Sequence, residues 1–328
     1  MGQLRVASLN SVEELMNSDL KNQDIAKKLS SRFILTGSFW KIDTLFQISM
    51  ELFDIEESKL IISQRWETQW SKLPSVKMDL SDKIIQGLGT KVLHNSADEY
   101  IVNTEAYELY LKAKHLHQKR KTKDDISISR DMINKALLLD PKFVDAKILL
   151  ANTYQTTDTY KALEYYSECL ELAVEMNDKQ SEMYIKIRMG NIYSEKWEFD
   201  KSIKLRREAY KIAKEIGNES SIANALSSLG GHYFDTWNSG DSMRFYVEKA
   251  MEIYKKLDDK KRLINQFNSL GLVYWIYDNE IGKAIEAFEQ SIELMDDLGD
   301  NFGIMAPYSN LGIIYHNKGE YEISLKYY

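Results

Sequence analysis

The sequence predicts a mostly helical protein, an α-solenoid of about five and a half helical hairpins that follows a small, incomplete α/β domain. Its 328 residues include only 3 Pro and 15 Gly, while 44% are hydrophobic and 28% are charged. This composition favours a folded, helix-rich chain over a disordered one. A segment that recurs about every 40 residues indicates the solenoid, and a strand-like pattern before residue 70 indicates the smaller domain.

The repeat is marked first by a small residue that stands three places before a tyrosine. It occurs as MGNIY at 189–193, LGGHY at 229–233, LGLVY at 270–274 and LGIIY at 311–315. The four glycines, Gly190, Gly230, Gly271 and Gly312, are therefore spaced 40, 41 and 41 residues apart. A degenerate copy, LANTY at 150–154, places Ala151 39 residues before the first of them.

A second signature follows each small residue by about 13 places. Its members recur with spacings of four and three, which place them on one face of a helix. The copies are Ala162-x3-Tyr166-x2-Cys169, Ser202-x3-Arg206-x2-Ala209, Met243-x3-Val247-x2-Ala250 and Ala284-x3-Phe288-x2-Ser291.

Each period therefore predicts two amphipathic helices that cross closely at a glycine or alanine. One such hairpin cannot cover its own apolar face, whereas stacked copies can, so we expect a right-handed solenoid. The motifs LG-x2-Y and A-x3-F-x2-A, with Pro141 in a linker, resemble the tetratricopeptide family. The expected hairpins span 104–142, 143–179, 180–219, 220–260 and 261–301, with a partial sixth from 302.

The end of the chain falls inside the last repeat. Ser324 and Tyr328 occupy the small and aromatic places of the second helix in the sixth unit. We therefore expect a solenoid domain over 104–328 that is truncated in its sixth repeat and lacks the polar cap of a finished array.

The first hundred residues predict a separate α/β domain over 1–95. Partial alternation of β-branched and aromatic residues predicts strands at 4–8, 32–40, 45–54 and 59–67. Amphipathic patterns predict helices at 22–30 and 81–89. The expected order is strand, helix, three strands and helix.

This region resembles the TolB-like N-terminal domain, related to the FlgO type. The segments that carry the resemblance are DIAKKLSSRFILTGSFWK, QISMELFD, ISQRWE and, at the join to the repeats, NTEAYELYLKAKHL. The opening strand and helix of that family would precede Leu4, so the domain is expected to be incomplete. The resemblance implies association with bacterial class III adenylate or guanylate cyclases, and no catalytic activity in this chain.

No catalytic or metal-binding constellation emerges from the sequence, and we expect no cofactor and no enzymatic activity. His115 and His117 lie two residues apart, hence on different helical faces, and Gly87 to Lys91 lacks the spacing of a phosphate loop. Cys169 stands at a packing position and is expected to be an inert buried thiol. The net charge of -7 is spread along the chain, which disfavours nucleic acid as a partner, and no apolar run is long enough to span a membrane.

The candidate binding surface is the concave face, which the first helix of each hairpin lines. Asn and Ser amides and hydroxyls can bond an extended peptide backbone, and aromatic rings can hold its side chains. Two tryptophans, Trp197 and Trp237, stand where the turn between helices often uses glycine. Each either folds over its adjacent repeat or serves as an aromatic anchor for a partner. Counting outward from the crossing glycines gives Asn191, Asn224, Ser227, Phe234, Asn265, Asn268, Trp275, Ser309 and His316.

The sequence therefore predicts a non-enzymatic scaffold, the regulatory or sensory portion of a bacterial signalling protein, that binds a protein or peptide. Two alternatives remain open: a fragment of a class III cyclase whose catalytic domain lies outside this chain, and the sensor part of a winged-helix transcription regulator. A homodimer formed through the incomplete sheet is a further hypothesis. The expected location is the cytoplasm, with the periplasmic side of a membrane-anchored protein as the alternative.

Overall fold

A computed structural model describes residues 22–29, 31–43, 45–69, 72–88, 102–120, 122–236, 239–297 and 305–328, together with the single residues 12 and 20. The chain divides into two compact units, one of which comprises Leu15–Asn177 and the other of which contains Asp178–Tyr328. The strand predicted at 4–8 and the candidate anchor Trp237 lie outside the described residues.

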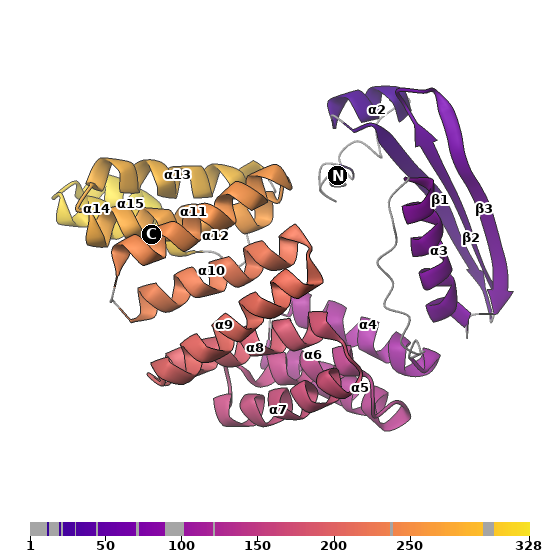
Figure 1. Ribbon diagram of the computed structural model, residues 1–328. Coiled ribbons are helices and arrows are strands. Elements are labelled where there is room, and N and C mark those ends of the chain that lie inside the picture. Colours follow the sequence, from indigo (N-terminus) through magenta and orange to yellow (C-terminus); the bar gives the residue numbers. More distant parts are fainter. Residues whose placement is uncertain are drawn as a thin grey trace. The chain divides into compact units, whose positions relative to one another are not determined.

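The first unit begins with a three-stranded antiparallel sheet in the order β1-β2-β3. The strands predicted at 32–40, 45–54 and 59–67 are all present, and so is the helix predicted at 22–30. The last helix of the region starts earlier than predicted, at Leu73, and ends at Gly87. The elements are α2 (Asn22–Lys28), β1 (Phe33–Ile42), β2 (Leu45–Asp54), β3 (Lys59–Gln69) and α3 (Leu73–Gly87), as Figure 1 shows.

One face of the sheet is apolar at alternate positions of the central strand. Phe46, Met50 and Leu52 are buried, since side chains an even number of residues apart share a face of a strand. Helix α3 packs against this sheet, and the indole Nε1 of Trp66 on β3 donates a 2.6 Å hydrogen bond to Asp79 on α3.

Asp54, at the end of β2, organises the turn into β3. Its carboxylate accepts hydrogen bonds from Nε and Nη2 of Arg32, at 3.0 and 2.7 Å, and from the backbone N–H groups of Glu56 and Glu57, at 2.9 and 3.1 Å. The hydrogen bond from Arg32 is the main cause that holds the pKa of Asp54 below its ordinary value. Both interactions favour the ionised form of the carboxyl group.

We expect the Asp54→Asn substitution to loosen the β1–β2 pairing at neutral pH. Because the folded-state pKa is depressed, the ionised carboxylate stabilises the fold above the unfolded-state pKa of about 4, and this contribution is lost as the pH falls through the folded-state pKa. Hydrogen exchange of the β1 and β2 amides should show weaker protection in the variant at pH 7, and a smaller difference from the parent chain as the pH is lowered. A difference that grows on acidification would contradict this.

Two helical hairpins complete the first unit. Their helices are α4 (Thr104–Lys119), α5 (Lys123–Leu139), α6 (Val144–Tyr154) and α7 (Thr159–Glu175). Cys169 on α7 is fully buried, and burial raises the pKa of its thiol to about 12, as expected for an unreactive packing residue. A shared core joins the two hairpins and includes Ala113, Ile133, Phe143 and Leu149.

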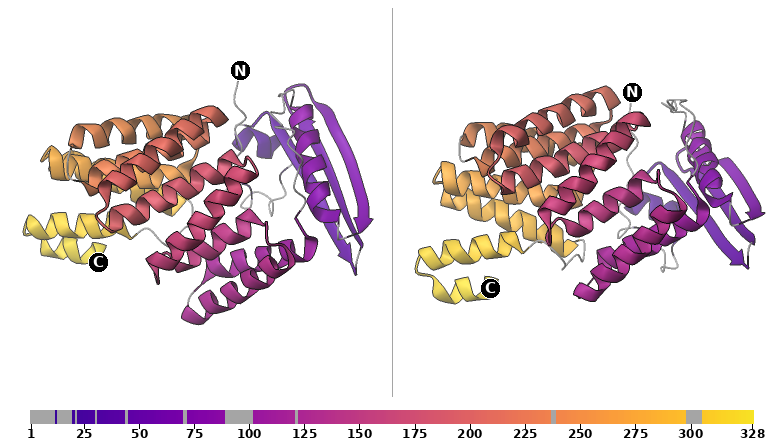
Figure 2. Two further views of the ribbon diagram at one scale, coloured as in Figure 1. Left: turned by 60° about the horizontal axis from the view of Figure 1, so that its bottom comes forward. Right: turned by 90° about the horizontal axis from the view of Figure 1, so that it is seen from below.

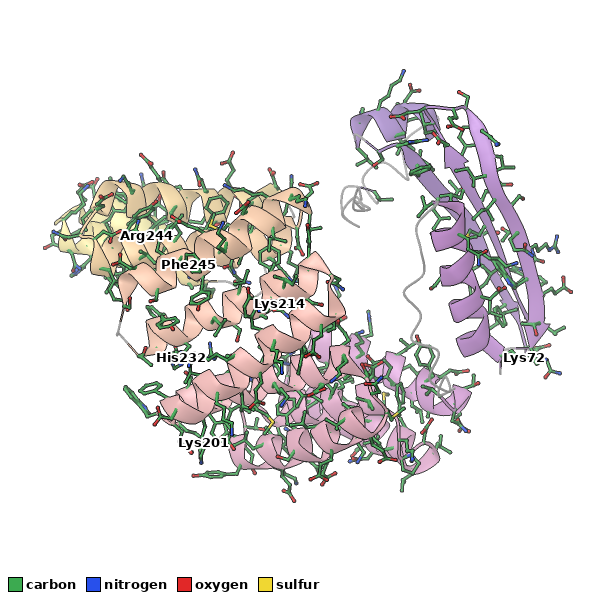
Figure 3. All side chains as sticks on the ribbon, in the orientation of Figure 1. Lys72, Lys201, Lys214, His232, Arg244 and Phe245 are labelled. Atoms are coloured by element: carbon green, nitrogen blue, oxygen red, sulfur yellow. The ribbon has the colours of Figure 1, made fainter. Side chains whose placement is uncertain are left out.

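The second unit consists of four further hairpins, which lie side by side in both views of Figure 2. The outer face of the second helices is charged, with Lys201 and Lys214 near opposite ends of α9 (Figure 3). The helices are α8 (Lys179–Glu195), α9 (Phe199–Ile216), α10 (Glu219–Asp235), α11 (Gly240–Lys256), α12 (Lys260–Leu272), the π-helical turn η2 (Val273–Tyr277), α13 (Ile281–Asp297), α14 (Ala306–Asn317) and α15 (Tyr321–Tyr327).

The cores of this unit are shared between successive hairpins, as a solenoid requires. One cluster joins α8 and α9 to the next first helix, α10, through Met183, Ile187, Ile212 and Ala225. The predicted α-solenoid of helical hairpins behind a small α/β domain is therefore confirmed.

The recurring glycines lie where the two helices of a hairpin cross. A Cβ atom at Gly190 would lie 3.0 Å from Cγ of Arg206, and one at Gly230 would lie 3.2 Å from Cγ2 of Val247. At Gly271 the distance to Cε1 of Phe288 would be only 2.5 Å. Each glycine thus faces the middle residue of the second signature, which is Arg206, Val247 or Phe288, as the repeat predicts.

Equivalent caps start the first helices of three successive hairpins. Asp178, Asn218 and Asp259 each accept a hydrogen bond from the backbone N–H three residues on, at 2.7–3.0 Å. In α14, Pro307 is the second residue of a helix that begins at Ala306, and proline is tolerated in the first turn of a helix. Similar starting points keep the first helices in register, so that their exposed faces form one surface.

Among the described residues, no helix combines the length and the apolar character needed to cross a membrane.

Candidate functional site

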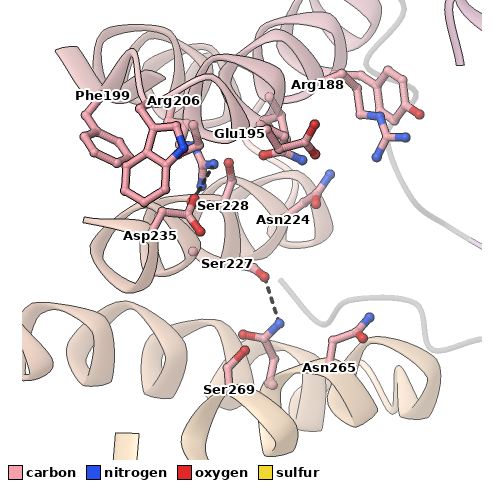
Figure 4. Close-up of a pocket in the computed structure, with 17 residues that line it drawn as sticks. Arg188, Glu195, Phe199, Arg206, Asn224, Ser227, Ser228, Asp235, Asn265 and Ser269 are labelled. Carbon is pink, nitrogen blue, oxygen red and sulfur yellow. Dashed lines mark hydrogen bonds and ion pairs between the residues drawn. The ribbon is translucent and has the colours of Figure 1, made fainter. Parts of the chain in front are cut away.

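A cavity of about 590 Å³ opens on the first-helix face of the second unit (Figure 4). Helices α8, α10 and α12 supply most of its wall, one from each of three successive hairpins, and α9 contributes two side chains. The lining residues are Tyr184, Ile187, Arg188, Asn191, Ser194, Glu195, Trp197, Phe199, Arg206, Asn224, Ser227, Ser228, Gly231, Asp235, Asn265, Gln266 and Ser269.

Three asparagines line this cavity, one from each first helix. Asn224 and Asn265 both stand six residues before a crossing glycine, so the repeat places them at equivalent heights, while Asn191 directly follows Gly190. Within the part of the chain that the structure describes, none of the three amide side chains is engaged in a hydrogen bond. Each amide offers both donors and an acceptor, so the wall can bond peptide N–H and C=O groups.

A second polar group lies between α10 and α12. The amide Nε2 of Gln266 donates a 2.8 Å hydrogen bond to Oγ of Ser227. Gln266 is only 3% exposed, yet its Oε1 has no hydrogen-bond partner among the described residues, and neither has Oγ of Ser228. Buried polar atoms are rarely left unsatisfied in proteins, because this costs about 1–3 kcal/mol each. Their position in the wall of a cavity indicates a site that is completed by a ligand or by water.

Arg206 departs most from the repeat. It occupies the place that Tyr166, Val247 and Phe288 fill in other hairpins, and its side chain is 3% exposed. Its Nη1 donates to the backbone carbonyl oxygen of Ser228, and its Nη2 lies 3.4 Å from Oδ2 of Asp235. Burial lowers the pKa of this guanidinium group to about 10.

The neighbouring Gly231 makes room for this guanidinium group. A Cβ atom there would lie 3.1 Å from Nη1 of Arg206, and apart from the adjacent backbone of α10 nothing else among the described residues would come within 4 Å of it. The equivalent position carries Asn191, Leu272 and Ile313 in other repeats. The pair of glycines at 230 and 231 therefore lets α10 accept the buried arginine of α9.

Acidic groups balance the arginines of the cavity. Glu195 and Asp235 stand at equivalent positions, five residues after a crossing glycine, and the cavity also includes Arg188. The formal charges of its lining residues thus cancel, with the least exposed charge on Arg206.

An aromatic pair forms one end of the wall. Trp197 is 76% exposed and packs edge-to-face on Phe199, with 5.8 Å between ring centroids. Its backbone φ of 61° lies in the left-handed region, which the equivalent turn of the last hairpin fills with Gly319 at φ 77°. An exposed indole at a position that favours glycine is costly, and it supports the aromatic-anchor interpretation of Trp197.

The cavity brings together five of the residues singled out in the sequence, namely Asn191, Trp197, Asn224, Ser227 and Asn265. Asn268 instead accepts a 3.0 Å hydrogen bond from Asn310 on the next first helix. The others do not line it: Phe234 packs against the hydrophobic core, Trp275 packs on Phe288, His316 lies edge-on to Tyr321, and Ser309 is on α14.

Helix geometry explains why Phe234, Trp275 and His316 do not line the cavity. At about 100° per residue, a side chain four places after the crossing glycine points only about 40° away from it, toward the partner helix. Positions one and five places after the glycine, and six before it, point about 100–140° away and share the open face. Phe234, Trp275 and His316 belong to the first group, whereas Glu195 and Asp235 belong to the second.

Sequence reasoning did not single out Arg188, Glu195, Arg206, Asp235 or Gln266 as part of the site. Two signals were present for Arg206: a charge at the aromatic place of the repeat, and an extra glycine at 231.

The described residues contain no group of three or more His, Cys, Asp or Glu side chains that could hold a metal ion.

Comparisons with known proteins found no matching family model and no matching curated protein. Among solved structures, a Rap protein complexed with Competence and Sporulation Factor aligns with a TM-score of 0.54 and 13% identity, over 76% of this chain and 77% of the other. The apo form of RapI aligns with a TM-score of 0.54 and 17% identity, over 79% and 93%. Aspartyl phosphate phosphatase F from Bacillus subtilis aligns with a TM-score of 0.53 and 12% identity, over 77% and 72%.

At these identities the alignments show the fold alone. The helical hairpins of this chain have the architecture of tetratricopeptide-like repeat proteins.

Proposed function

We propose that this chain is a non-enzymatic interaction module that binds an extended protein or peptide segment in the cavity on its first-helix face. The observation that carries the proposal is the set of three amide side chains, Asn191, Asn224 and Asn265, which three successive hairpins direct into one cavity. An extended backbone presents alternating N–H and C=O groups, and side-chain amides match both.

The wider setting of the proposal is the regulatory or sensory part of a bacterial signalling protein, in the cytoplasm, with a TolB-like domain over 1–95 ahead of repeats over 104–328. The resemblance of the N-terminal segments to that family supports this setting. So does the fold shared with a Rap protein that was solved with Competence and Sporulation Factor.

The test is binding of blocked peptides to the full chain. The probe is a pool of N-acetylated, C-amidated octapeptides with random uncharged residues, and the readout is the fraction retained by the immobilised protein. We expect the double variant Asn224→Ala, Asn265→Ala to weaken retention about tenfold, because two hydrogen bonds contribute about 1–3 kcal/mol together.

Asn268→Ala is the matched control, since Asn268 bonds Asn310 and does not line the cavity. It should leave retention unchanged. Retention that is equal in all three proteins would reject the proposed function.

A further inference from the structure

The buried guanidinium group of Arg206 has more hydrogen-bonding capacity than the protein uses. A guanidinium group carries five N–H donors in a fixed plane. Within the described residues only Nη1 and Nη2 are engaged, with Ser228 and Asp235, and Nε has no partner. Tyr, Val or Phe fills this place in other repeats, so packing alone does not require a charge.

Asp235, the counter-ion of Arg206, lies too far away for a strong ion pair. The 3.4 Å separation between Nη2 of Arg206 and Oδ2 of Asp235 exceeds the length of about 2.7–2.9 Å that is usual for a charge-assisted hydrogen bond. The side chain of Asp235 is 35% exposed, against 3% for Arg206. Water therefore solvates the acid far better than the base, and the buried cation is left short of negative charge.

Access to the cation comes from the cavity. The guanidinium group occupies the space in front of Gly231 on α10, where a side chain would project from the first helix. Figure 4 shows Arg206, Ser228 and Asp235 close together in the wall. An acceptor that enters here meets the guanidinium group and the hydroxyl of Ser228, whose oxygen has no partner among the described residues.

We propose, building on the proposed function, that the segment bound in this cavity presents a carboxylate, which binds Arg206 and displaces the carboxylate of Asp235 into solvent. Arg206 is thus the residue that determines specificity for an acidic group. A carboxylate suits the planar fork of a guanidinium group, which can bond both of its oxygens. The same group comes either from a Glu or Asp side chain within the segment or from a C-terminus.

Three octapeptide pools test the proposal on the full chain. In the first, N-acetylated and C-amidated, one position is fixed as Glu and the rest are random uncharged residues. The second carries Gln at that position, and the third has no Glu but a free C-terminal carboxylate. We expect the first or the third pool to bind about tenfold more tightly than the second, and the tighter of the two identifies the source of the carboxylate.

Arg206→Met removes the charge at similar volume. Its melting temperature should equal or exceed that of the parent, since apolar side chains fill this place in other repeats, and the preference for carboxylate pools should disappear. Arg207→Met is the matched control: it removes the same charge from the next, exposed residue of α9, outside the cavity, and should keep the preference. If Arg206→Met does not fold, Gly231→Ala crowds the guanidinium group instead and should reduce the preference.

Equal binding of the Glu, Gln and free-terminus pools would overturn this inference while leaving the proposed function intact. A preference that survives in Arg206→Met, or is unchanged in Gly231→Ala, would do the same. Failure of all three pools to bind the parent chain would overturn both.

Discussion

Replacing Gly271 by Ala should lower the stability of the second unit by about 3 kcal/mol, which corresponds to a fall of about 6–12 °C in melting temperature for a unit of this size. The added Cβ atom would lie 2.5–2.8 Å from three ring carbons of Phe288. That ring is fully buried at the crossing of α12 and α13, so it cannot swing into solvent. The helix must move away or the ring must leave its rotamer, and either change loosens the core.

Gly282→Ala is the control for helix propensity. Gly282 lies in α13, and apart from the adjacent backbone of its own helix no atom of the described residues comes within 4 Å of the position that its Cβ would take. Alanine there should raise stability by up to about 1 kcal/mol, because it restricts the unfolded chain and favours helix. Thermal melts of both variants check the prediction. A Gly271→Ala variant that melts like Gly282→Ala would show that the helices do not cross closely at this glycine.

The hairpins could be predicted because their pattern is local and repeated. The crossing glycine and the large residue that it faces stand about 16–17 places apart, as Gly190 and Arg206 or Gly271 and Phe288 do, so one period contains the whole contact. The three strands of the N-terminal sheet were predictable because their pattern is also local: residues alternate along each strand, and short turns join neighbouring strands. The early start of α3 was missed because its first turn includes Pro74, which favours the first positions of a helix although it breaks the interior.

The site was less predictable for two reasons. It depends on the rotation of each first helix about its own axis, and on which side chains of the second helices extend between the first helices into the cavity. The Asn224 and Asn265 column follows directly from the repeat, and both residues line the cavity. Phe234 and Trp275 point in a different direction around the helix axis from Asn224 and Asn265. Counting residues from the crossing glycine did not show that only the asparagines face the cavity. Arg206 belongs to a second helix, and it reaches the cavity only because Gly231 has no side chain.

The π-helical turn η2 shows a second reason why counting residues from the crossing glycine does not always identify equivalent positions. In the α12–α13 hairpin, the N–H of Glu280 bonds the carbonyl of Tyr274, six residues back, whereas in the α8–α9 hairpin Glu198 bonds Tyr193, five residues back. The extra residue moves the left-handed position of the turn from 278 to Asn279. Asp278, which the repeat aligns with Trp197, therefore does not share its place in the turn.

Trp197→Gly should stabilise the fold and weaken ligand binding together. Glycine adopts the left-handed backbone conformation at φ 61° without a steric penalty, so relief of strain should add about 1 kcal/mol of stability, or about 2–4 °C in melting temperature. Trp197 is 76% exposed and its indole packs edge-to-face on Phe199, so little buried surface is lost with the ring. If the ring serves as an anchor in the cavity wall, retention of the octapeptide pools should fall about tenfold or more.

Asp258→Gly separates the two effects. Asp258 has φ 52° in the turn between α11 and α12 and does not line the cavity, so glycine there should relieve similar strain and leave peptide retention unchanged. A Trp197→Gly variant that is less stable than the parent would mean that the indole covers its own repeat and contributes to the fold. A Trp197→Gly variant that is more stable than the parent and binds the peptides equally well would show that Trp197 has no role in binding. Only the combination of higher stability with weaker binding identifies Trp197 as an aromatic anchor, because evolution retains a strained residue where function requires it.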